Sequence, residues 1–87
     1  FYPIKLEYYK SIEKDENRPN NNYVKFGISV VKTEYIPDNI KIVSREVKDI
    51  STDESKIENL LAILKEKEVT PVAVEEIIKD LQPEYLS

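Results

Sequence analysis

The chain has 87 residues, of which 40% are hydrophobic and 34% charged, and its formal net charge is −4. This length allows one domain with one core, and the acidic excess disfavours broad electrostatic binding to nucleic acid or anionic lipid. Cysteine and histidine are absent, which excludes disulfides, thiolate or imidazole metal sites and catalysis by histidine.

The N-terminal half of the chain predicts the start of a β-meander. Apolar and polar residues alternate from Ile4 to Ile12, which indicates a half-buried strand. The segment 15–22 is rich in asparagine and predicts a solvent loop. A second strand alternates from Val24 to Val30, with its apolar residues at even positions. After Val30 the less polar residues stand at odd positions instead. A change of parity inverts the buried face, so we expect a bulge near Val30–Val31.

A turn and a third strand complete the predicted meander. Pro37, Asp38 and Asn39 are turn formers. The third strand should run from Ile40 to about Lys48, with a second change of parity before Val43. We expect Ile36 to pair with Ile40, which would place the two irregularities close together across the hairpin.

Two amphipathic helices follow the meander. The first begins at Ser51, Thr52 or Asp53 as N-cap, with Glu54 suited to a capping box, and should end near Lys67 or Glu68. The second begins at Pro71, with Thr70 as N-cap, and should end at Pro83. Each helix carries an apolar stripe at i, i+3, i+4 and i+7. The stripes are Ile57, Leu60, Leu61 and Leu64, and Val74, Ile77, Ile78 and Leu81.

Three strands followed by two helices predict an α+β fold, a three-stranded antiparallel β-meander with both helices on one sheet face. Residues 1–87 form one domain, with the meander over 1–48, the helices over 51–82 and a tail over 83–87. The predicted core joins one face of the sheet to the two helical stripes. Its members are Ile4, Leu6, Tyr8, Phe26, Ile28, Ile57, Leu60, Leu61, Leu64, Val74, Ile77, Ile78 and Leu81.

Two short segments around the second helix carry a family resemblance. Val69-Thr70-Pro71-Val72 and Ile77-Ile78-Lys79-Asp80, preceded by a tyrosine-bearing meander, resemble a family of small clostridial-type bacterial proteins of unknown function. The resemblance covers nearly the whole chain. It implies no assigned activity and no catalytic residues.

The sequence predicts no catalytic, cofactor or metal site. Acidic residues gather before the first helix, at Asp49, Asp53 and Glu54, where the helix dipole favours negative charge. The serines have no histidine to activate them. The single glycine, Gly27, lies within a strand, which indicates a bulge or close packing and not a phosphate loop. We therefore expect a protein that is not an enzyme.

Several tyrosines and valines are not part of the predicted core, and we expect them on the sheet face opposite the helices. The candidate interface is Tyr9, Tyr23, Val31, Tyr35, Val43 and Val47. One interpretation treats them as ordinary strand residues, and another as a protein-binding surface, because tyrosine is enriched in interface cores. A third combines the tyrosines with cations as a platform for single-stranded RNA. Those cations are Lys5, Lys25, Lys32, Lys41 and Arg45.

The sequence favours a non-catalytic bacterial interaction or regulatory module that binds a protein partner, including a second copy as a homodimer. The alternative is a nucleic-acid-binding accessory protein that uses the same face. No apolar run approaches the roughly 20 residues of a membrane span, so we expect no membrane partner. The absence of cysteine fits a cytoplasmic location.

Overall fold

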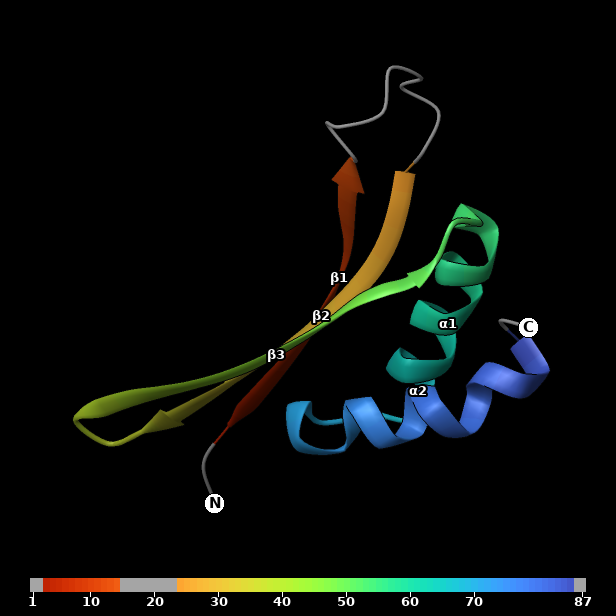
Figure 1. Ribbon diagram of the computed structural model, residues 1–87. Coiled ribbons are helices and arrows are strands. Elements are labelled where there is room, and N and C mark those ends of the chain that lie inside the picture. Colours follow the sequence, from red (N-terminus) through yellow and green to blue (C-terminus); the bar gives the residue numbers. More distant parts are fainter. Residues whose placement is uncertain (1–2, 15–23, 86–87) are drawn as a thin grey trace.

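The computed structural model describes residues 3–14 and 24–85, with the side chains beyond residue 81 left aside. It contains β1 (Ile4–Lys14), β2 (Val24–Ile36), β3 (Asn39–Ser51), α1 (Glu54–Glu66) and α2 (Pro71–Tyr85) (Figure 1). The strands form one antiparallel sheet in the order β1-β2-β3. Both helices lie on one side of this sheet, so the predicted α+β meander with two helices is confirmed. The predicted loop over 15–22 and Tyr23 fall outside the described residues.

The helix termini follow from local chemistry. Asp53 caps α1, because its carboxylate accepts a hydrogen bond from the Ser55 amide at 3.0 Å. A hydrogen bond from the Ser55 hydroxyl lowers the pKa of Asp53, and the bond from the Ser55 amide lowers it further. The first residue of α2 is Pro71, as predicted, and the Thr70 carbonyl accepts the first backbone bonds of this helix. The helix continues to Tyr85, so the prediction that Pro83 ends it is wrong.

Cross-strand pairing shows which residues share a face of the sheet, because directly opposed residues point to the same side. Tyr8 pairs with Val30, and Val30 pairs with Arg45. This set faces the helices, since the Tyr8 hydroxyl donates to the Val69 carbonyl at 2.8 Å and Arg45 forms an ion pair with Glu75 of α2. We call this side the inner face and the opposite side the outer face.

The core occupies the inner face over one half of the sheet only. Phe26, Ile28 and Val30 of β2 pack against the buried stripes of α1 and α2. The core also includes Val30, Ile50 and Val69, which the predicted core omitted. Ile4, predicted to be in the core, is 58% exposed, and Ile12, expected on the buried side of the first strand, is 56% exposed. Both lie near the ends of β1, away from the middle of the strand where Tyr8 contacts the helical segment.

The bulge lies elsewhere than predicted. The β1–β2 register runs without interruption past Val30 and Val31, and the irregularity falls between Phe26 and Ile28. There the segment 48–50 of β3 lies opposite Gly27. Asp49, within this segment, has a φ of 58°. The bulge lets Ile50 enter the core as a buried residue. The expectation for Gly27 is confirmed.

The hairpin turn also differs by one residue from the prediction. Ile36 pairs with Asn39, and Tyr35 pairs with Ile40. Pro37 and Asp38 therefore form a two-residue loop, in which Asp38 has a φ of 66°. Proline at the first central position and positive φ at the second match a type II turn. No change of register occurs in the hairpin, so every residue there keeps the face that strict alternation assigns.

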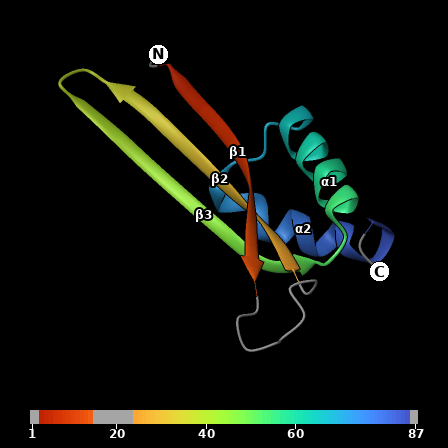
Figure 2. The ribbon, with the colours of Figure 1, turned by 90° about the horizontal axis from the view of Figure 1, so that it is seen from above.

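The far half of the sheet projects beyond the helices. Figures 1 and 2 both show the β2–β3 turn at the end of a long ribbon, with α1 and α2 gathered at the other half. The principal extents are 51 × 29 × 17 Å, and the radius of gyration of 14.9 Å exceeds the ~12 Å typical of a compact chain of this length. We call residues 31–44 of this ribbon the distal hairpin.

Candidate functional site

The six residues of the predicted interface do not form one surface. Val31, Tyr35 and Tyr9 lie on the outer face, as expected. Val43 and Val47 lie on the inner face, and Val47 packs against the core. Their placement on the outer face was a consequence of the predicted change of register, which does not occur. Tyr23 falls outside the described residues.

Tyr9 is also separated from Tyr35. It pairs with Ser29, six residues from Tyr35 along β2, which corresponds to about 20 Å. The Tyr9 hydroxyl donates to the Glu7 carboxylate beside it, and this hydrogen bond raises the pKa of Tyr9. Tyr9 is therefore engaged locally and contributes no continuous surface with Tyr35.

The distal hairpin forms an apolar outer surface of its own. Tyr35 is 42% exposed, and its cross-strand neighbour Ile40 is 58% exposed. Ile42, two residues along β3 on the same face, is 65% exposed and pairs with Thr33. A hollow of about 820 Å³ at the turn is lined by Tyr35 and Ile40, together with Pro3, Ile36, Pro37, Asp38 and Asn39. We call Val31, Tyr35, Ile40 and Ile42 the distal patch.

Sequence reasoning missed Ile40 and Ile42 as surface residues. The signal that would have found them is the two-residue loop formed by Pro37 and Asp38. This loop opposes Tyr35 to Ile40 and keeps both on the outer face.

The cations of the predicted RNA platform are divided between the two faces. Lys5, opposite Thr33, and Lys25, opposite Glu13, lie on the outer face, and Lys25 forms an ion pair with Asp49 at 3.4 Å. Lys32, Lys41 and Arg45 lie on the inner face, and Lys32 forms an ion pair with Glu34 at 2.9 Å. The tyrosines of the outer face are thus not accompanied by the predicted set of cations, and the geometry gives the nucleic-acid alternative no support.

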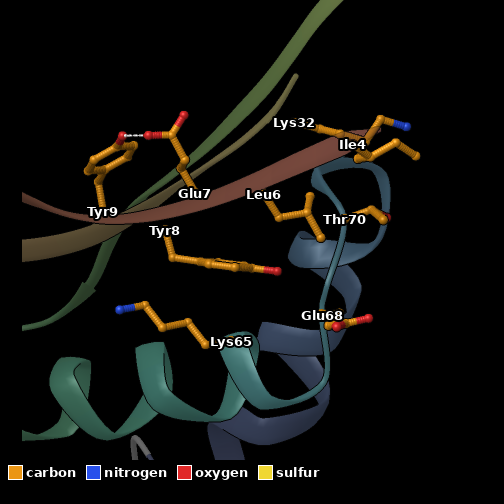
Figure 3. Close-up of a pocket in the computed structure, with 9 residues that line it drawn as sticks. All are labelled: Ile4, Leu6, Glu7, Tyr8, Tyr9, Lys32, Lys65, Glu68 and Thr70. Atoms are coloured by element: carbon orange, nitrogen blue, oxygen red, sulfur yellow. Dashed lines mark hydrogen bonds between the residues drawn. The ribbon is translucent and has the colours of Figure 1, made fainter. Parts of the chain in front are cut away.

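A second concave feature lies between β1 and the segment that links α1 to α2. This groove has a volume of about 850 Å³ (Figure 3). Leu6 and Tyr8 enter it from β1, and Lys65, Glu68 and Thr70 border it from the helical side. Four consecutive residues of β1 line it, from Leu6 to Tyr9. Their side chains alternate between the two faces of the sheet, so the groove follows the outer edge of that strand. Its remaining lining residues are Ile4, Glu7, Tyr9 and Lys32. We call it the edge groove.

Tyr8 joins the two sides of the edge groove. Its ring spans from β1 to the α1–α2 link, where its hydroxyl donates to the Val69 carbonyl (Figure 3). Burial, with a smaller contribution from the Glu68 carboxylate, raises the pKa of Tyr8 above its ordinary value of 10.0. The neutral phenol is therefore the form that stabilises the fold.

Tyr8→Phe is expected to lower the free energy of unfolding by about 0.5–1.5 kcal/mol at neutral pH, because it removes one partly buried hydrogen bond. The stabilisation is present below the ordinary tyrosine pKa of about 10 and lost as pH rises through the higher folded-state pKa. Urea denaturation of both proteins at neutral and strongly alkaline pH measures this. Their stabilities should converge at high pH, and Tyr35→Phe should leave the free energy of unfolding at neutral pH unchanged. A constant difference at all pH values would contradict the role of the hydroxyl.

The described residues hold no group of three or more acidic, histidine or cysteine side chains that could bind a metal ion. Within the same residues, no helix is long and apolar enough to cross a membrane.

The chain matches a family model over nearly its whole length. The model of DUF6514, described as a family of unknown function, matches residues 2–84. Searches of curated proteins and of solved structures returned no match. The expected membership of a family of unknown function is thus confirmed over nearly the whole sequence, and the chain belongs to the DUF6514 family.

Proposed function

We propose that this protein is a non-catalytic interaction module that associates with a second copy of itself through the distal patch. The observation that carries the proposal is the exposure of Tyr35, Ile40 and Ile42 on one face of a ribbon that neither α1 nor α2 covers. Clustered apolar side chains on a projecting element are typical of protein-binding surfaces.

The composition of the patch supports a second copy as the partner. Its residues are apolar or aromatic, so two patches can face each other without burying a charge, which would be costly. The nearest outer-face charges, Lys5 and Glu7 of β1, lie opposite Thr33 and Val31 along one side of the patch. They form an ion pair with each other at 3.9 Å and would remain at the rim. A contact of this kind is isologous, since the same residues serve both copies, and two-fold dimers are the commonest assemblies.

Tyr35→Glu and Ile42→Glu are each expected to weaken dimerisation at least about thirtyfold, because each places a charge in the centre of the contact. Sedimentation velocity over a range of protein concentrations measures the dimer constant, and circular dichroism checks that the fold persists. Lys41→Glu is the matched control, since Lys41 is exposed and neighbours Ile42 in sequence but lies on the inner face.

Two results would overturn the proposal. One is a wild-type protein that stays monomeric at millimolar concentration. The other is a dimer that tolerates both outer-face substitutions but is lost in Lys41→Glu.

A further inference from the structure

The outer edge of β1 carries backbone groups that its own sheet leaves unpaired. The Tyr35 amide donates to the Pro3 carbonyl at 3.1 Å, so the backbone of Pro3 points toward β2. In an antiparallel pair this direction alternates with each residue. The amides and carbonyls of Ile4, Leu6 and Tyr8 therefore point away from β2, and β1 is an edge strand of the described sheet.

The same three residues line the edge groove with their side chains. Free backbone groups and apolar side chains thus belong to one stretch of strand. The opposite wall, formed by the end of α1 and the α1–α2 link, is held to β1 by the bond from Tyr8 to Val69. An open strand edge beside a helical wall is the arrangement in which an added β-strand is bound in other peptide-recognition domains.

The groove lining carries two lysines, Lys32 and Lys65, and two glutamates, Glu7 and Glu68, so the preference for a charged ligand depends on a single position, Lys65. Figure 3 shows the Lys65 side chain extending beneath the Tyr8 ring, at one end of the groove. Within the part of the chain that the structure describes, Lys65 has no ion pair, whereas the other groove lysine, Lys32, is paired with Glu34. A ligand carboxylate next to Lys65 would therefore gain an ion pair that the free protein lacks.

We infer that the edge groove binds an extended segment of a partner protein by strand addition along Ile4–Tyr8. The segment is about five residues long, since this stretch of strand spans roughly 16 Å. Its backbone pairs with that of Ile4, Leu6 and Tyr8, its alternate apolar side chains pack on those of Ile4 and Leu6, and a carboxylate meets Lys65. This site is separate from the distal patch and does not depend on dimerisation.

A designed heptapeptide tests the inference. Asp-Val-Thr-Val-Thr-Val-Asp, blocked and fluorescently labelled, has an acid at each end, so that either strand direction brings one to Lys65. We expect saturable binding by fluorescence anisotropy, with NMR amide shifts at Leu6 and Tyr8. N-methylation of alternate backbone nitrogens should abolish binding. Replacing both aspartates with asparagine should weaken it about tenfold, as expected for loss of a charge-assisted contact.

Protein variants locate the site. Lys65→Glu should weaken the acidic peptide about tenfold and remove its preference over the asparagine form. The matched control Lys67→Glu, an exposed lysine at the end of the same helix but outside the groove, should bind as the wild type does. Ile4→Asp, at a position 58% exposed, should abolish binding without unfolding the chain.

Three outcomes would overturn the inference. These are no binding at millimolar peptide, equal binding of the N-methylated peptide, and amide shifts confined to the distal patch. A fourth would assign the edge to a second copy of this chain: dimerisation lost in Ile4→Asp but kept in Tyr35→Glu. That pattern would also contradict the proposed dimer, whereas the first three would leave it standing.

Discussion

Ile28→Ala is expected to lower the free energy of unfolding by about 2–5 kcal/mol, whereas Ile42→Ala should change it by less than about 1 kcal/mol. Both positions are isoleucines within strands of the same sheet. Ile28 lies on the inner face with no exposed surface, while Ile42 lies on the outer face and is 65% exposed. Truncation leaves a cavity only at Ile28, because only there do neighbouring side chains enclose the removed atoms.

Urea denaturation of the two variants, at a concentration where the wild type is monomeric, measures the difference. The comparison tests which face of the sheet packs in the core. Both substitutions remove the same atoms and the same intrinsic preference for a β-strand, so a difference in stability reports burial alone. Similar losses at the two positions would mean that something covers the outer face of the distal hairpin in the monomer. That would contradict the exposure on which the dimer proposal rests.

Gly27→Ala is expected to destabilise the protein by about 1–3 kcal/mol, because the bulge brings another strand against this position. A Cβ added there would lie 2.5 Å from the Val47 carbonyl oxygen and 2.7 Å from the Ser11 hydroxyl. The first neighbour is backbone, so it cannot rotate away as a flexible side chain does. The steric clash can be relieved only if β3 moves away from β2 at the bulge, and this same bulge places Ile50 in the core.

Ser29→Ala is the control for Gly27→Ala, since Ser29 lies on the same face of β2 and opposite regular strands. Thermal and urea denaturation of both variants measure the effect. Replacing glycine by alanine at an unstrained site would instead stabilise by about 0.4–1 kcal/mol through the unfolded chain. A stabilised Gly27→Ala variant would therefore show that the two strands separate easily at the bulge.

The helices and the fold class were predictable because the relevant signals are local. Pro71 marks the start of α2, and the stripes beginning at Ile57 and Val74 repeat at helical spacing. The register of the strands was predicted wrongly for a specific reason. After Val30 the apolar residues of β2 move to the outer face, and we attributed this to a slip of the strand. The register of β2 in fact continues without a slip. What changes along the strand is which of its two faces carries the apolar side chains.

The candidate site was only partly predictable. Alternation assigns side chains to one of two faces, but which face the helices cover, and how far along the ribbon they reach, depends on tertiary packing. Val43 was therefore placed with Tyr35, although the two lie on opposite faces. The edge groove had no sequence signal at all, because it exists only once the α1–α2 link packs beside Tyr8.

The bond from Tyr8 to Val69 joins residues that are 61 positions apart in the chain. The meander pairs strands that are consecutive, so its contacts close short loops, whereas the docking of the link onto β1 closes a loop of about 60 residues. Loop-closure entropy makes such non-local contacts late and slow to form. During synthesis, the first strand emerges long before the link that completes its inner face. Because α1 and α2 follow the meander in the chain, chaperones would thus encounter a sheet whose apolar inner face stays uncovered until these two helices have been synthesised.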